Sequence, residues 1–106
     1  MSFPIAAGLL DAVVLSVLEQ EDAYGYRITQ QVRSKLNVSE STLYPVLRRL
    51  EKNGDLTVYD RACDGRNRRY YAITPAGQQQ LETYRIDWYA YRNGIEALLF
   101  TGGEGV

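Results

Sequence analysis

The chain has 106 residues, of which 45% are hydrophobic, and this fits one ordered domain with a modest core. It has no histidine and one cysteine, Cys63, so composition excludes zinc fingers, Ser-His-Asp triads, Cys-His dyads and an internal disulfide. We therefore expect no enzyme activity, no metal site and no cofactor. The formal net charge is −1, but residues 23–72 hold ten of the twelve Lys and Arg and only five acids. This local excess predicts a cationic functional surface on an acidic scaffold.

Residues 5–18 predict a helix that is apolar on nearly every side, apart from Asp11 and Ser16. The segment is too short to span a bilayer, and it lacks the basic leader and the cleavage site of a signal peptide. We therefore expect a cytoplasmic protein without a membrane partner. A helix this apolar needs covering on more than one face.

Two further helices follow, joined by a short connection. The apolar spacing predicts one helix over residues 24–35 and a second that runs to about Asn53. Ser39 or Ser41 is the expected N-cap of the second helix, and Gly54 ends it. Two helices so connected, the second amphipathic with basic outward positions, are typical of a helix-turn-helix.

The second of these helices turns a polar face away from the core. At about 100° per residue, the outward positions are Ser41, Pro45, Arg48 and Lys52, with Tyr44 and Arg49 on the flanks. Hydroxyls at the helix start suit base edges in a major groove, and the later cations suit phosphates. An ordinary amphipathic helix with a solvated basic face is the alternative. A proline inside a helix costs up to about 3 kcal/mol, less if Ser41 is the N-cap and Pro45 lies in the first turn.

Residues 56–59 and 69–73 predict a β-hairpin, with a long polar tip over residues 60–68. Four arginines surround this tip: Arg61, Arg66, Arg68 and Arg69. Such a tip can follow phosphates or enter a narrow minor groove. A tip that merely keeps the protein soluble is the alternative.

The last helix is expected to begin at Thr74-Pro75. Its apolar residues are spaced 3, 4, 3, 4, 3, as in a heptad seam: Leu81, Tyr84, Trp88, Tyr91, Ile95 and Leu98. This spacing predicts a homodimer, and packing on the chain's own domain is the alternative. Within the seam, Trp88, Tyr84 and Tyr91 are candidates to hold a planar aromatic small molecule between two copies. A plain core role for Trp88 in the dimer remains the other interpretation.

Three motifs together resemble the PadR family of bacterial regulators. They are the run from Ser39 to Pro45 with Leu47, Arg49-Leu50-Glu51 and Gly54; the wing Gly65-Arg66, Arg68-Arg69-Tyr70-Tyr71, Ile73-Thr74 and Gly77; and Tyr24-Gly25-Tyr26. The resemblance covers roughly residues 5–98 and implies a dimeric repressor of genes for phenolic-acid detoxification, drug efflux or related stress responses.

The resemblance also implies details of the dimer and of the site. The C-terminal helix of one subunit would pack on the first helix of its partner, at Leu10 and Val14, and Trp88 matches a ligand-sandwiching tryptophan of multidrug-sensing relatives. Two residues depart from the family pattern: Ser41 replaces a usual glycine, and Asp55 replaces a usually apolar residue.

The expected fold is mainly α with a small β-hairpin: a winged helix-turn-helix over residues 1–74, a dimerisation helix over 75–100 and a flexible tail over 101–106. The expected partner is double-stranded DNA carrying an inverted-repeat operator. A winged helix that binds protein is the alternative, which the arginines of the hairpin tip disfavour, and no constellation supports an enzyme. The expected DNA contacts are Tyr24, Lys35, Ser39, Ser41, Thr42, Tyr44, Pro45, Arg48, Arg49, Lys52, Arg66, Arg68 and Arg69. The expected dimer contacts are Leu10, Val14, Leu81, Tyr84, Trp88, Tyr91, Ile95 and Leu98.

Overall fold

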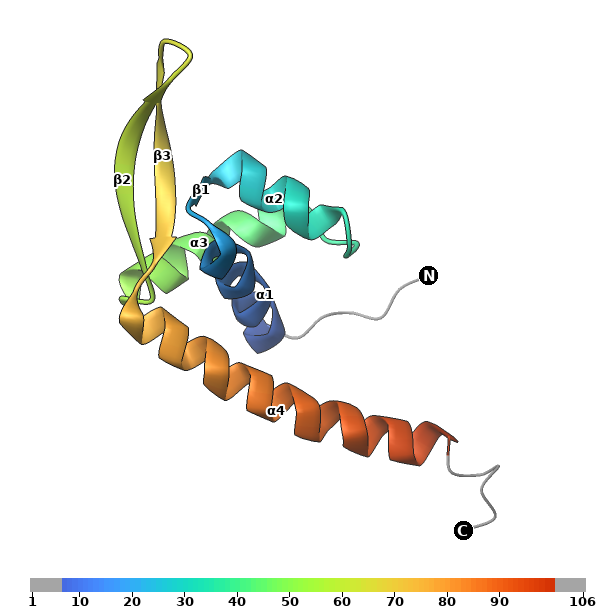
Figure 1. Cartoon of the computed structure of the whole chain (residues 1–106). Coiled ribbons are helices and arrows are strands. Elements are labelled where there is room, and N and C mark those ends of the chain that lie inside the picture. The colour runs from blue at the N-terminus through green and yellow to red at the C-terminus, as the bar shows by residue number, and fades with distance from the viewer. Residues whose placement is uncertain (1–6, 101–106) are drawn as a thin grey trace.

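The computed structural model describes residues 7–100, so the expected tail over 101–106 and the start of the first predicted helix lie outside the described residues. The elements are α1 (Ala7–Gln20), β1 (Ala23–Tyr24), α2 (Gly25–Arg33), α3 (Glu40–Lys52), β2 (Leu56–Cys63), β3 (Arg66–Ile73) and α4 (Pro75–Phe100). The β2–β3 hairpin rises from one side of the α1–α3 group, and α4 runs away from the other (Figure 1). The fold is mainly helical with one small sheet, as expected.

Helix α1 forms the centre of the core. Its residues Leu10, Val14, Leu15 and Leu18 are at most 4% exposed, and α1 contacts α2, α3, β3 and α4. The sequence indicated that α1 needs covering on more than one face, but not which element covers it. The chain's own α4 helps to cover the second apolar face.

This packing corrects part of the expected dimer seam. Leu10, Val14 and Leu81 are 4%, 0% and 1% exposed, so they are covered by the chain itself. The reason is geometric: α4 begins directly after β3 and crosses α1, so the first position of the seam packs inside the domain. Only the later positions of the expected seam are left uncovered by the chain itself.

The helix-turn-helix differs from the expectation at its borders. Helix α2 ends at Arg33, and Tyr24 belongs to the short strand β1 rather than to the helix. Ser39 is the N-cap of α3, with its Oγ accepting from the backbone N–H of Thr42 at 3.2 Å. Pro45 therefore lies in the second turn of α3 and withholds a backbone donor there, so the milder cost expected for a first-turn proline does not apply.

The three-stranded sheet is antiparallel in the order β1-β3-β2. Strands β2 and β3 pair without interruption from Leu56↔Ile73 to Cys63↔Arg66. Asp64 and Gly65 alone connect them, with φ of 52° and 77°. A two-residue Asp-Gly turn with positive φ at both positions is favoured in hairpins. The expected long tip over residues 60–68 is therefore wrong: the arginines around the turn lie on regular strands.

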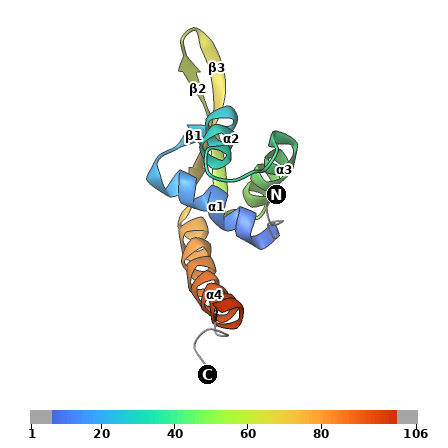
Figure 2. The same ribbon diagram turned by 90° about the vertical axis from the view of Figure 1, so that its right-hand side faces the viewer.

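Helix α4 begins close to the rest of the domain and then leaves it. The Thr74 hydroxyl accepts from the Gly77 N–H at 3.0 Å, which caps the helix. A Cβ at Gly77 would collide with the Asp55 carbonyl and lie 2.9 Å from the Ile73 side chain, so glycine permits this close start. Within α4 only Gly77 and Leu81 are buried, and the later turns project from the body (Figure 2). No helix within residues 7–100 is long and apolar enough to cross a membrane.

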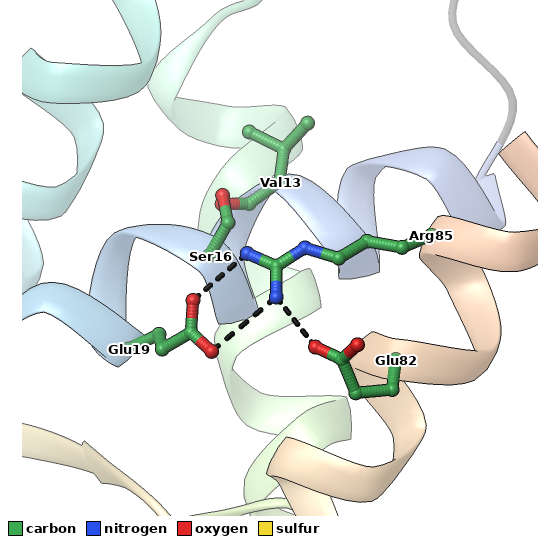
Figure 3. A network of polar contacts seen from close by, with 5 residues as sticks. All are labelled: Val13, Ser16, Glu19, Glu82 and Arg85. Atoms are coloured by element: carbon green, nitrogen blue, oxygen red, sulfur yellow. Dashed lines mark hydrogen bonds and ion pairs between the residues drawn. The ribbon is translucent and has the colours of Figure 1, made fainter. Parts of the chain in front are cut away.

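One ionic cluster joins α4 to α1. The Arg85 guanidinium donates to both carboxylate oxygens of Glu19 on α1, at 2.8 and 3.3 Å, and to Glu82 one turn earlier on α4, at 2.6 Å (Figure 3). In the same view Ser16 on α1 donates back to the Val13 carbonyl at 2.7 Å. The charge cluster lies at the last point where α4 is still partly covered, since every residue from Ile86 to Phe100 is exposed.

Candidate nucleic-acid interface

The N-terminus of α3 presents three exposed hydroxyls. Ser39 Oγ lies 3.0 Å from Ser41 Oγ and 2.8 Å from Thr42 Oγ1. The partial positive charge of a helix N-terminus favours anions at this end. The three hydroxyls can therefore serve as hydrogen-bonding groups for base edges or for a phosphate.

The outward face of α3 agrees with the periodicity of the sequence. Ser41, Pro45, Arg48 and Lys52 are all exposed. Among residues 7–100 neither Arg48 nor Lys52 takes part in an ion pair. Their positive charges are thus available to a polyanion.

A shallow groove of about 460 Å³ lies where α2, α3 and β3 meet. It brings together residues that are far apart in the sequence: Tyr24, Gly25, Tyr26, Tyr44, Arg66, Arg68, Arg69 and Tyr71. A Cβ at Gly25 would lie 2.9 Å from Cε1 of Tyr44, so the glycine leaves room for that ring. Tyr24, Tyr44 and three of the expected arginines therefore share one concave cationic surface.

Helix α3 and the β2–β3 hairpin also share one electrostatic environment. Burial raises the pKa of the Tyr71 hydroxyl, and the positive charges of Arg69 on β3 and Arg48 on α3 act against this rise in pKa. Two arginines from different elements thus act on one side chain. A ligand with several negative charges can contact both elements at once.

One face of the sheet carries a stack of aromatic rings and arginines, and two of its members, Tyr24 and Arg68, also line the groove. Tyr70 packs edge-on against Tyr24, with ring centroids 5.5 Å apart, and in parallel with Tyr59 at 5.7 Å. Arg68 lies over the Tyr24 ring at 4.4 Å, and Arg61 over the Tyr70 ring at 5.2 Å. Cation–π contacts of this kind hold a guanidinium in place without neutralising its charge.

Tyr59 and Tyr70 are not among the contact residues expected from the sequence. The hydroxyl of Tyr59 donates to Asp22 at 2.7 Å, which ties the wing to the segment before β1, and this bond raises the pKa of Tyr59. The sequence carries a signal for this stack, because Tyr59 alternates with Arg61 and Arg68 alternates with Tyr70. Side chains two residues apart on a strand point to the same face of the sheet.

Two of the expected DNA contacts lie elsewhere. Arg49 forms an ion pair with Asp11 that links α3 to α1, and it does not line the groove, although 42% of its side chain is exposed. Lys35 is exposed in the connection after α2 and does not line the groove.

The later seam of α4 remains open in the single chain. Trp88, Tyr91, Ile95 and Leu98 are 38%, 64%, 39% and 80% exposed. The Trp88 and Tyr91 rings lie 6.2 Å apart with 41° between their planes. Tyr84 is half-buried against α1. Within residues 7–100 there is no group of three His, Cys, Asp or Glu that could hold a metal ion.

The helix pair α2–α3, with the hairpin beside it, defines a winged helix-turn-helix DNA-binding protein. Comparison with known proteins gives the family. The profile of the transcriptional regulator PadR-like family matches residues 14–83. The chain therefore belongs to the PadR-like family of transcriptional regulators, which bind DNA and are not enzymes.

Individual relatives agree with this assignment. A transcriptional regulator of Mycobacterium tuberculosis, Rv3488, is 43% identical over 74 residues, which are 66% of this chain and 69% of the relative. The crystal structure of smu.1704 from Streptococcus mutans is 35% identical, has a TM-score of 0.86 and overlaps 93% of each chain. A PadR family transcription regulator from Clostridium difficile has 31% identity and a TM-score of 0.79 over 85% of this chain and 97% of its own.

Proposed function

We propose that the protein is a homodimeric repressor that binds an inverted-repeat operator through α3 and the β2–β3 wing. The groove that joins Tyr44 of α3 to Arg66, Arg68 and Arg69 of the wing carries this proposal. In the proposed complex the hydroxyl end of α3 enters the major groove and the wing arginines follow the phosphates. A two-fold dimer then reads half-sites about 10 bp apart, or a multiple of that.

Exposed apolar surface on α4 supports the dimer. Beyond Arg85 this helix carries eight large hydrophobic residues that are at least 38% exposed. Apolar surface gathered in this way marks an interaction site in most proteins. The heptad spacing favours another copy of the same helix as the partner.

A planar aromatic effector is the second step of the proposal. The indole of Trp88 is not enclosed within the chain, and Tyr91 lies beside it. Near a two-fold axis two such indoles can stack on both faces of a flat molecule, and apolar burial supplies most of the affinity. We propose that such a ligand releases the repressor from DNA.

The salt dependence of DNA binding tests the main proposal. A duplex that the protein selects from a random-sequence pool is titrated at several salt concentrations. Log affinity should fall by about 0.9 log units per log unit of salt for each phosphate that is neutralised. Arg48→Ala, and the pair Arg66→Ala with Arg68→Ala, should weaken binding and lower the slope. Arg92→Ala removes the same charge from α4 and serves as the matched control.

Salt-independent binding, or equal slopes in all variants, would contradict the proposed interface. Transcription from a promoter that overlaps the selected site separates repression from activation. Adding the protein should lower the yield of transcript, and an increased yield would refute the repressor role.

A further inference from the structure

Asp11 is a buried carboxylate on α1, and its residue is 8% exposed. A charge withdrawn from water is costly unless partners satisfy it. Its two oxygens have partners on two different helices. Oδ1 accepts from Nη2 of Arg49 on α3, and Oδ2 accepts a long hydrogen bond of 3.4 Å from the Tyr84 hydroxyl on α4.

The Arg49 end of this network links α3 to α1 and restrains the rotation of α3. Arg48 and Arg49 are consecutive, so they point about 100° apart around the helix axis. With Arg49 tied to Asp11, a roll of α3 about its axis would break this partly buried ion pair as well as the packing of the apolar face of α3. The buried apolar face of α3 turns Arg48 outward, and the Asp11–Arg49 pair adds a polar link that holds α3 against α1 in this orientation.

The Tyr84 end connects the same carboxylate to the helix that carries the proposed dimer seam. Tyr84 is half-buried, and the negative charge of Asp11 adds to the effect of burial in raising the pKa of its hydroxyl. The other ionic link between α1 and α4, from Arg85 to Glu19, does not involve α3. Among the ion pairs of the described residues, only the one formed by Asp11 lies in a network that joins α1, α3 and α4.

We infer that Asp11 is a positioning residue for DNA recognition: it sets the orientation of α3 relative to α4. The inference rests on the proposed α4-mediated dimer. In such a dimer a change in the angle between α3 and α4 moves the two recognition helices apart or together. Asp11 thereby specifies the half-site spacing that the dimer accepts, although it does not touch DNA.

Distances between spin labels in the full-length dimer test this inference. The parent protein carries Cys63→Ser, which removes its only native thiol, and Ser41→Cys, which places one nitroxide on each α3. Asp11→Asn removes the charge with little change in shape, and Tyr84→Phe removes only a hydroxyl. Tyr89→Phe is the matched control, because it removes a hydroxyl from the same helix at a residue that is 58% exposed.

The parent should give one narrow distance between subunits. Asp11→Asn should broaden that distribution several-fold, Tyr84→Phe should broaden it less, and Tyr89→Phe should leave it unchanged. In binding assays with the selected half-site at different spacings, the unlabelled Asp11→Asn and Tyr84→Phe proteins should lose most of their preference between spacings. Their affinity for a single half-site should stay close to that of the wild type.

Unchanged distance widths and spacing preferences in both Asp11→Asn and Tyr84→Phe would overturn the inference, as would an equal loss of affinity for every DNA, since a general structural defect predicts that result. If Asp11→Asn fails to fold, Tyr84→Phe still decides the question. A parent protein without any distance between subunits would instead refute the proposed dimer and, with it, this inference.

Discussion

Arg85 of α4 and Glu19 of α1 face each other with two hydrogen bonds, Nη2 to Oε1 at 2.8 Å and Nη1 to Oε2 at 3.3 Å. The contact lowers the pKa of the Glu19 carboxyl and raises the pKa of the guanidinium, so both groups stay charged at neutral pH. It links α4 to α1 (Figure 3), just before α4 becomes fully exposed.

This pair predicts a pH-dependent effect of Glu19→Gln. A carboxyl whose pKa is lower in the folded state adds stability above its unfolded pKa, and that stability is lost as pH falls through the folded value. Glu19→Gln should therefore lower the urea midpoint at pH 7, and the difference from wild type should disappear in strong acid. Glu96→Gln removes the weaker pair with Arg92, at 3.8 Å within α4, and is the control. A difference that persisted at low pH would assign the effect to packing rather than to charge.

The close packing around Gly77 predicts that a larger residue at the start of α4 destabilises the protein. Gly77→Ala places a methyl group against the Asp55 carbonyl, where the backbone cannot give way easily. Overpacking of this kind typically costs about 1–3 kcal/mol, so the thermal midpoint should fall. Gly94→Ala is the matched control, because no atom lies within 4 Å of its added Cβ. There the exchange should raise stability by up to about 1 kcal/mol through helix propensity. Equal effects at the two glycines would show that the close approach at Gly77 is unimportant.

The proposed dimer predicts that charge in the α4 seam separates the subunits. Trp88→Lys with Tyr91→Lys puts two cations where the copies should meet, so light scattering should report monomers or aggregates. Ile86→Lys with Tyr89→Lys adds the same charge to the opposite face of α4 and should leave the dimer mass unchanged. A dimer that survives the seam variant would refute the assignment of the interface.

The proposed effector site predicts quenching of Trp88, which is the only tryptophan in the chain. Titration with planar aromatic dyes should lower its emission in the dimer at micromolar concentrations. Tyr91→Lys with Ile95→Lys disrupts the seam and keeps the tryptophan, so quenching should be lost. Quenching that persists in this variant would show that the dye does not need a shared pocket. Absence of quenching by any dye in the dimer would favour a plain packing role for Trp88.

Much of the architecture could be predicted from the sequence, because the signals are local. Helix α3 is identified by four apolar residues at helical spacing, all of them buried: Leu43, Val46, Leu47 and Leu50. Because these residues face the core, helix geometry alone places Arg48 on the outward side. The strong β propensity of residues 56–59 and 69–73 identifies the wing. The Asp64-Gly65 pair also carried enough information for a tight turn, although the polar residues around it suggested a longer loop.

Other features were decided by contacts between distant segments. Strand β1 has two residues, too few for any periodic signal, and it exists because Ala23 and Tyr24 pair with β3. Arg49 lies on a flank of α3, and only the tertiary structure brings it to Asp11 on α1.

The same holds for the α4 seam. Its spacing is identical whether a residue meets the chain's own α1 or a second subunit, so the sequence determined that the seam is apolar. Only the packing of α4 across α1 buries Leu81 and leaves Trp88 and Tyr91 exposed. The reason is physical: periodicity reports which face of a helix avoids water, whereas the element that covers this face depends on the path of the whole chain.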